Sequence, residues 1–246
     1  MDESKVKALI VAACELQGKI DSARKTCFDQ YRAKETEQAN SIRVLVDGAV
    51  ASMTMKMTQK IQETSETISY QISLAASYVR THFIINDLIM SGDLIEAITL
   101  IRKQLESLTR LHELDKKPVG KLAGKVPNVR HIFNQASGRL YGELSEIAHF
   151  AKPRVGELLH VIEEAERVGP NIMPVYSERC IGCYDLQVFL AIYFLGWFTE
   201  KLPTWYPGYD NEEDKSTVGY IAMLAQNSGM IELADDKQLA QKPSSE

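Results

Sequence analysis

The chain has 246 residues, of which 45% are hydrophobic and 25% charged, and its formal net charge is −5. These proportions are typical of a globular protein with a sizeable core, and they exclude a disordered or fibrous chain. The net negative charge gives no general attraction to nucleic acid or to anionic membranes, so such a partner would need a local basic patch.

The cysteine content and the longest apolar run predict a cytoplasmic protein with no membrane partner. Four cysteines in a chain of this length do not form a disulfide scaffold. The first residues, MDESKVK, are acidic where a signal peptide needs positive charge. The longest apolar run, VFLAIYFLGWF at 188–198, is far shorter than the roughly 20 residues that cross a membrane. We therefore expect this run to form a buried core helix.

Apolar or small residues recur every three or four positions along the first thirty residues, which predicts one long helix with a single apolar stripe. The stripe contains Leu9, Ala13, Leu16, Ile20, Ala23, Cys27 and Tyr31. The stretch RAKETEQANS at 32–41 loses this spacing and predicts a bend.

The same spacing resumes at Ile42 and continues to Val79, which predicts a second helix over 42–89. A continuous helix of that length would measure about 70 Å, more than a compact core can cover. Residues 1–90 are therefore interpreted as a long, coiled-coil-like arm. Two alternatives stay open: the arm folds back on its own first helix, or it forms a contact between copies of the chain.

The remainder of the chain predicts an all-α helical bundle over 91–233. Gly92 ends one helix, and Ser91 or Asp93 caps the next, expected over 93–115 with an apolar stripe from Leu94 to Leu108. A Gly- and Pro-containing loop (115–128) precedes short helices at 129–136 and 139–150 and a helix from Pro153 to Val168. Helices are also expected at 178–201 and 214–229, and the polar tail (234–246) is expected to be disordered.

Two helical segments carry the candidate catalytic residues. Arg102 and Glu106 are four positions apart and are expected to form an ion pair. Ser145 and His149 have the same spacing and could share a hydrogen bond, although a nucleophile also needs an oriented base and an oxyanion donor. If the two helices meet, the arginine–glutamate pair would orient the histidine; the alternatives are a surface ion pair and a structural histidine.

These two segments resemble a bacterial all-helical domain family of unknown function, which is itself similar to abortive-infection and HEPN-like domains. The resemblance rests on LIRKQLESLTRL and LYGELSEIAHF and covers residues 85–200. The matching positions are Arg102, Glu106, Tyr141, Leu144, Ser145 and His149. It implies an all-helical fold and a setting in bacterial (phage) defence.

The resemblance to HEPN ribonucleases implies a dimeric site in which each copy contributes an arginine and a histidine that are five to seven positions apart. Arg154 and His160 in RVGELLH have that spacing. This pair predicts metal-independent RNA cleavage as an alternative function.

A basic block precedes the candidate histidine helix and is the strongest indication of a phosphate-bearing partner such as RNA or another polyanion. It contains Lys116, Lys117, Lys121, Lys125, Arg130 and Arg139, and no acidic residue lies between Lys116 and Gly142. The alternative interpretation is a solvated loop. GKLAGK within this block does not match a nucleotide-binding loop, because Val126 follows where Ser or Thr would be required.

No cofactor and no metal are predicted. Cys180 and Cys183 have the spacing of half a zinc site, but no second pair exists, and core packing is the favoured interpretation. Trp205, Tyr206 and Tyr209 are expected to cover the core. The sequence leaves open whether the chain is an enzyme. It predicts a self-associating regulatory or interaction module that forms a homo-oligomer through 1–90, with a HEPN-like ribonuclease as the alternative.

Overall fold

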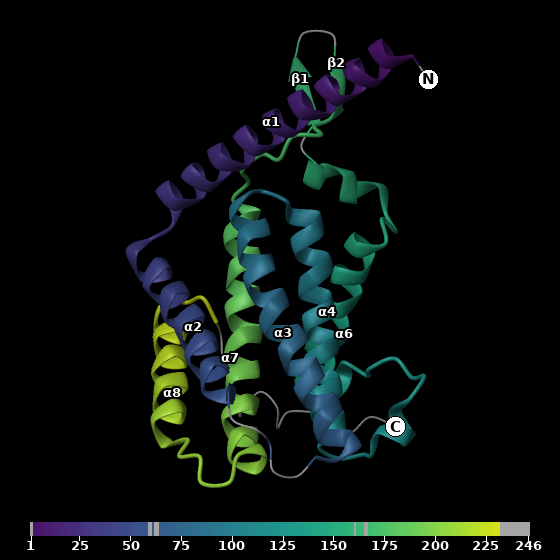
Figure 1. Cartoon of the computed structure of the whole chain (residues 1–246). Helices are drawn as coiled ribbons and strands as arrows, with labels where there is room; N and C mark the ends of the chain where they lie inside the picture. Colours follow the sequence, from purple (N-terminus) through teal and green to yellow (C-terminus); the bar gives the residue numbers. More distant parts are fainter. Residues whose placement is uncertain (1, 59–60, 62–63, 160, 165–166, 232–246) are drawn as a thin grey trace, which may run out of the picture. The chain divides into compact units, whose positions relative to one another are not determined.

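The computed structural model describes residues 2–58, 61, 64–159, 161–164 and 167–231. The fold class is all-α, as predicted (Figure 1). The α-helices are α1 (Glu3–Lys34), α2 (Glu37–Met55), α3 (Glu66–Met90), α4 (Leu94–Leu114), α5 (Val119–Leu122), α6 (Arg130–Ala148), α7 (Arg179–Trp205) and α8 (Glu212–Asn227). The other elements of the described chain are two 3-10 helices, η1 (Lys56–Thr58) and η2 (Pro153–Leu159), and one antiparallel pair of strands, β1 (Val161–Glu164) and β2 (Arg167–Pro170).

Contacts within the chain divide it into two units, and each is described by itself. The first unit contains the described residues of 1–35 and 60–190, and the second those of 36–59 and 191–246. Helix α7 is shared, since its residues 179–190 belong to the first unit and 191–205 to the second. The division differs from the boundary predicted at residue 90. The predicted tail at 234–246 lies outside the described residues.

The first unit is built on α3 and α4, which lie side by side, with α6 packed on α4 (Figure 1). The predicted stripe of α4 is confirmed, because Ile101, Leu105 and Leu108 are completely buried. Burial of each such side chain stabilises the folded chain by about 1.5–3 kcal/mol. The turn between the two helices needs glycine at 92, where φ is +82° and an added Cβ would lie 3.0 Å from the Cys27 sulfur.

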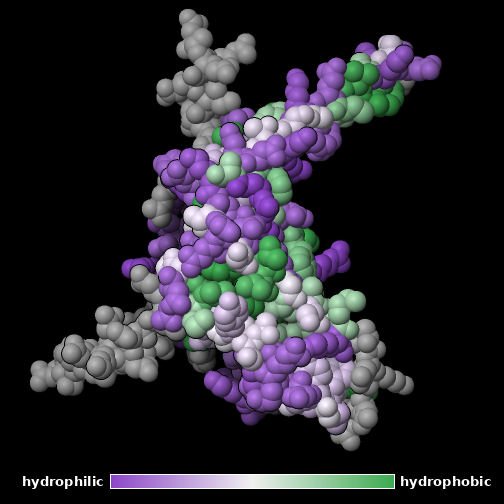
Figure 2. All heavy atoms as spheres, turned by 90° about the vertical axis from the view of Figure 1, so that its left-hand side faces the viewer, coloured by the Kyte–Doolittle hydropathy of each residue, from purple (hydrophilic) through white to green (hydrophobic). Residues whose placement is uncertain are grey.

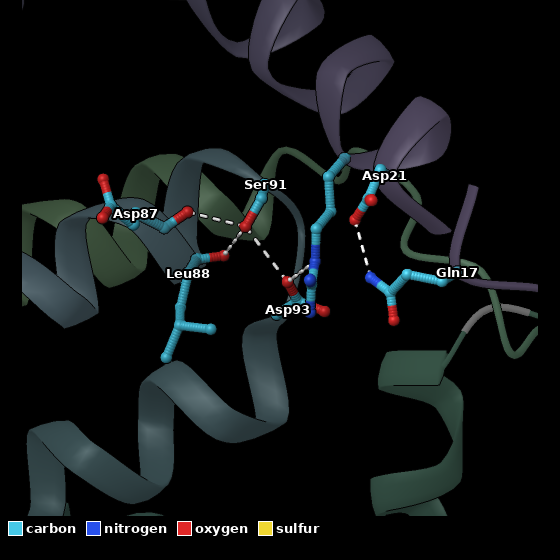
Figure 3. Close-up of polar contacts among 7 residues, drawn as sticks. Gln17, Asp21, Asp87, Leu88, Ser91 and Asp93 are labelled. Atoms are coloured by element: carbon cyan, nitrogen blue, oxygen red, sulfur yellow. Dashed lines mark hydrogen bonds and ion pairs between the residues drawn. The ribbon is translucent and has the colours of Figure 1, made fainter. Parts of the chain in front are cut away.

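Helix α1 is attached to this unit only through its C-terminal part. Cys27 and Tyr31 are its buried residues, and the Tyr31 ring meets the ring of Tyr184 edge-on at 6.3 Å. Arg24 forms an ion pair with Asp93 (Nε–Oδ2 2.9 Å) at the α3–α4 turn. Figure 3 shows this turn, where Ser91 donates to the Asp87 carbonyl and to the Asp93 carboxylate.

The N-terminal part of α1 extends away from the other helices of the unit. From Asp2 to Lys19 every residue is exposed except Val6, which is half-buried. Figure 2 shows hydrophobic surface on the end of this helix, at the top of the view. The exposed apolar side chains there are Leu9, Ile10, Val11 and Leu16.

The second unit consists of α2, α8 and the C-terminal part of α7. The rings of Phe194 and Phe198 stack with centroids 5.2 Å apart, and Trp205 meets Phe198 edge-on at 6.0 Å. Trp205 and Tyr206 are buried, in agreement with the predicted core cover. The half-buried Tyr209 donates a hydrogen bond to the Asp214 carboxylate.

The continuous helix predicted over 42–89 is wrong. Helix α2 ends at Met55, Met57 leaves helical geometry with ψ at 19°, and α3 begins only at Glu66. The apolar spacing continues through this break, but Ser65 starts a new helix by accepting a hydrogen bond from the Ile68 N–H. The bend predicted at 32–41 is confirmed, because α1 ends at Lys34 and Thr36 caps α2.

Two other predicted elements differ from the structure. The short helices predicted at 129–136 and 139–150 form the single helix α6, because Gly138 weakens a helix by about 1 kcal/mol without ending it. The helix predicted from Pro153 to Val168 is wrong, since η2 is followed by β1 and β2. The β-branched residues Val161, Ile162 and Val168 favour strands in this stretch.

Helix α7 is the one helix of the described chain that is long and apolar enough to cross a membrane. Half of its most apolar 18-residue window is buried inside the protein. The core helix of a soluble protein has the same length and composition, so this feature is weak evidence for a membrane span.

Candidate functional site

The structure brings together four of the five polar residues that the resemblance singles out on α4 and α6. The Tyr141 hydroxyl donates to Glu106 Oε1 (2.7 Å) and accepts from Arg102 Nη2 (3.0 Å). Arg102 Nη2 also lies 3.1 Å from Glu106 Oε1, which confirms the predicted ion pair. Arg102 Nη1 lies 2.7 Å from His149 Nε2. We call these four residues the α4–α6 cluster.

His149 is held in this arrangement by a hydrogen bond from Arg102. A guanidinium has only donors, so Arg102 Nη1 donates this hydrogen bond and the Nε2 atom of His149 accepts it. Burial lowers the pKa of Arg102, but the hydrogen bond to Tyr141 and the charge of Glu106 outweigh it, and the pKa is raised overall. Arg102 therefore remains a cation that holds the histidine as an acceptor.

The position of His149 follows from how α6 ends. His149 is the C-terminal cap residue, and Phe150 after it has φ of +49°, a conformation that favours glycine. The Phe150 N–H donates to the Ile147 carbonyl and the Ala151 N–H to the Glu146 carbonyl, which is the Schellman pattern. A residue other than glycine in this region costs about 1–3 kcal/mol, so the helix end stores strain directly beside the histidine.

Ser145 does not join the cluster. Its Oγ atom is buried and has no hydrogen-bond partner among the described residues, and the His149 ring contacts Arg102 instead. The Ser145–His149 hydrogen bond considered from the sequence is therefore not formed. A serine nucleophile needs an adjacent base, and this geometry does not provide one.

The α4–α6 cluster thus fastens α6 to α4. The Arg102 and Glu106 side chains are 20% and 27% exposed, so their ion pair is partly shielded from water. The Arg102 guanidinium also lies over the Tyr141 ring, 5.1 Å from its centroid. Hydrogen bonds of this kind, to charged groups, contribute about 1.5–3 kcal/mol each.

The residues of the predicted basic block have different environments. Lys116, Lys117, Lys121 and Lys125 are exposed on the loop between α4 and α6, which includes α5. Arg139 lies 4.0 Å from its neighbour Glu143 on the exposed face of α6. Arg130 is exposed, and its Nε atom would lie 3.2 Å from a Cβ added at Gly138. The lysines and the arginines therefore do not form one uniform patch.

The alternative pair, Arg154 and His160, is not placed. His160 lies outside the described residues, and so does the side chain of Arg154. The structure therefore gives no geometry for this pair.

The predicted core packing of the cysteine pair is only partly met, because Cys180 is buried and Cys183 half-buried. Burial raises the pKa of both thiols, that of Cys183 to about 12, so both are uncharged at neutral pH. Among the described residues no group of three or more His, Cys, Asp or Glu could hold a metal ion.

A buried polar group in the first unit was missed from the sequence. His82 on α3 is completely buried, and its Nδ1 and Nε2 atoms lie 2.9 Å and 3.4 Å from the amide nitrogens of Gln187 and Asn86. The ring nitrogen that carries the proton decides whether the oxygen or the nitrogen of each side-chain amide faces the ring. The available signal was the spacing of His82, which lies four residues after Tyr78 and three before Ile85, on the apolar side of the helix.

No family model, curated protein or solved structure matches this chain. The resemblance to abortive-infection and HEPN-like domains therefore stays a prediction.

Proposed function

We propose that this chain is a helical interaction module that self-associates through the N-terminal part of α1. The observation that carries the proposal is that the apolar stripe of α1 is buried at its C-terminal end and exposed at its N-terminal end. Cys27 and Tyr31, at its C-terminal end, are each 2% exposed. Leu9 and Leu16, on the same stripe, are 62% and 43% exposed.

A second copy of the same helix fits the exposed part of the stripe. Leu9, Ala13 and Leu16 follow the four- and three-residue spacing of a two-stranded coiled coil. Val6 and Ile10 widen this face, and no charged residue lies on it between positions 6 and 16. Two identical uncharged faces can meet without like-charge repulsion, which would disfavour a pair of charged faces.

The contacts that hold α1 within the first unit favour its association with the same helix of a second copy. The helix is held at Arg24, Cys27 and Tyr31 by contacts within the first unit. Asp2 caps its other end by accepting a hydrogen bond from the Ser4 N–H. A helix that is formed before binding loses less conformational entropy when it binds.

The proposal is tested by placing a charge on the stripe and, as a control, the same charge on the opposite side of the helix. Leu9→Lys lies on the stripe, whereas Val11→Lys lies on the opposite side of α1 and is also an exposed apolar position, at 47%. We expect Leu9→Lys to weaken dimerisation at least tenfold and the Leu9→Lys, Leu16→Lys double variant to be monomeric. Val11→Lys should associate like the wild type. Light scattering at matched concentrations measures the mass of each.

Circular dichroism checks that the variants keep their helices, which is expected because these side chains are exposed. If Leu9→Lys and Val11→Lys associate equally well, the stripe is not the interface. If the wild type is monomeric and the exposed face binds lipid vesicles, its occupant is a membrane surface and the proposal fails.

The second candidate function is metal-independent RNA cleavage, and one observation favours it: the contact of Arg102 with the exposed His149. The test compares RNA cleavage by the wild type and by a His149→Ala, His160→Ala double variant. Equal rates would remove this candidate.

A further inference from the structure

We infer that the α4–α6 loop and the adjoining face of α3 form a binding site for single-stranded nucleic acid. The site consists of a cavity of about 480 Å³ and the lysines around it. Ser69, Tyr70 and Ser73 of α3 line one side of the cavity. Leu122 and Lys125 of the loop line the other side. This inference does not depend on self-association through α1.

The backbone of the loop is fixed by a buried arginine. Arg110 of α4 is 5% exposed and donates hydrogen bonds to the carbonyls of Leu122 (3.2 Å) and Lys125. Its Nη1 atom also lies 3.2 Å from Glu113 Oε2, and Glu113 Oε1 accepts from the Asn128 N–H at 3.0 Å. The Nη1 and Nη2 atoms of Arg110 are therefore engaged within the protein, and they hold the loop in place before any ligand binds.

Two further contacts shape the loop. The Gln71 side chain on α3 donates to Asp115 Oδ1 (2.8 Å) at the start of the loop. Gly124 has φ of +71°, which lets the chain turn directly after α5. The turn brings Lys125 to the cavity wall.

The loop lysines are free to bind phosphates. Lys116, Lys117, Lys121 and Lys125 are exposed, and no carboxylate in the described part of the chain forms an ion pair with them. Four cations within ten residues give a local positive potential despite the net charge of −5. Each phosphate neutralised on a single strand releases counterions, so binding becomes weaker as salt increases.

The cavity wall suits a nucleobase better than a phosphate. The Tyr70 ring is 39% exposed beside the cavity, and stacking of a base on such a ring is tolerant of sequence. The Ser69 and Ser73 hydroxyls can donate to base oxygens or nitrogens. Glu66, which also lines the cavity, would repel a phosphate but can accept from the exocyclic amino group of adenine or cytosine. The site therefore places a base in the cavity and phosphates along the lysines.

The experiment measures binding of a fluorescein-labelled 12-nucleotide oligoadenylate RNA by anisotropy at several salt concentrations. The Lys121→Glu, Lys125→Glu variant should bind at least tenfold more weakly, and its slope of log K against log salt should fall by about 1.4, which is 0.7 for each lost phosphate contact. The matched control is Lys7→Glu, Lys25→Glu on α1, which makes the same change in net charge at two exposed lysines outside the loop. The control should retain wild-type affinity and slope.

Substitution of the aromatic residue separates base stacking from charge. Tyr70→Ala should bind on the order of tenfold more weakly with an unchanged salt slope, whereas Tyr70→Phe keeps the ring and should bind like the wild type. Tyr70 is exposed, so both variants are expected to fold, and circular dichroism checks this.

Three outcomes would overturn the inference. One is equal weakening in the two double lysine variants, which would make the effect one of net charge alone. Another is that the wild type does not bind the oligonucleotide at low ionic strength, or that its binding does not weaken as salt is added. The third is binding to vesicles containing phosphatidylserine that the oligonucleotide does not displace, which would assign the loop to a lipid surface.

Discussion

Arginine side chains of α4 and α6 differ in burial, and their contributions to stability should differ accordingly. Arg110 is 5% exposed and pairs with Glu113, whose side chain is 10% exposed. Arg139 pairs with Glu143 at the surface, and its side chain is 88% exposed. Removing one partner of a buried pair leaves a charge without compensation, whereas exposed pairs contribute little.

We therefore expect Arg110→Ala to lower the free energy of unfolding by about 3 kcal/mol. Arg139→Ala should change it by no more than about 0.5 kcal/mol. Urea unfolding of both variants, followed by circular dichroism, measures the difference. Equal, small effects would mean that Arg110 does not fix the loop.

At this scale the sequence allowed part of the α4–α6 cluster to be predicted. The spacing of Arg102 and Glu106 predicted their ion pair, because residues four apart are neighbours on a helix surface. The same rule failed for Ser145 and His149, because α6 ends at His149 and Arg102 takes the ring nitrogen. Spacing within one helix cannot reveal such competition from a second helix.

Helices with a clear apolar stripe were predicted well, and helix ends less well. Helix α4 agrees with its prediction to within one residue at each end, because its apolar stripe is clear and because Gly92 and the Gly- and Pro-containing loop mark its two ends. The break between α2 and α3 was missed, because apolar residues kept the helical spacing through it. The β1–β2 pair was missed because each strand is only four residues long. The apolar spacing of so short a segment cannot be distinguished from that of a single turn of helix.

In the second unit, a buried carboxylate connects η1, which directly follows α2, to α8. Asp214, in the first turn of α8, is 5% exposed and accepts hydrogen bonds from Lys56 Nζ (2.7 Å) and from the Tyr209 hydroxyl. Burial and the hydrogen bond to Asp214 raise the pKa of Tyr209 to about 12. The hydrogen bond to Asp214 also raises the pKa of Lys56.

Stability should fall as the pH rises from about 10 to about 12. In that range the unfolded chain loses the Tyr209 proton, at a pKa of about 10, while the folded chain retains it, so unfolding becomes more favourable. Lys56 acts in the same direction, because its raised pKa stabilises the folded chain only while the ammonium is protonated. Tyr209→Phe should therefore lose less stability over this range than the wild type does.

Urea unfolding at several pH values between about 9 and 12 measures this difference, because stability is linked to the protons that each state binds. The matched control is Tyr220→Phe on α8, where the side chain is 53% exposed, and this variant should follow the wild type. A Tyr209→Phe variant that loses as much stability as the wild type would show that the Asp214 contact does not hold the proton.

At the scale of the whole molecule, the exposed N-terminal part of α1 is the feature that distinguishes this helix from the others. Helices α2, α3, α4, α7 and α8 have buried residues along much of their length, but α1 has none before Cys27. An exposed apolar face on a formed helix is typical of a surface that binds a partner. A long arm and its self-association were predicted from the sequence. The structure narrows the interface proposed for it from residues 1–90 to the first twenty.

The most direct test of self-association is the mass of the wild-type protein as a function of its concentration, measured by sedimentation equilibrium. We predict that the mass rises from the monomer value of 27.6 kDa towards twice that value at high micromolar concentration. A mass that stays at 27.6 kDa throughout this range would contradict it.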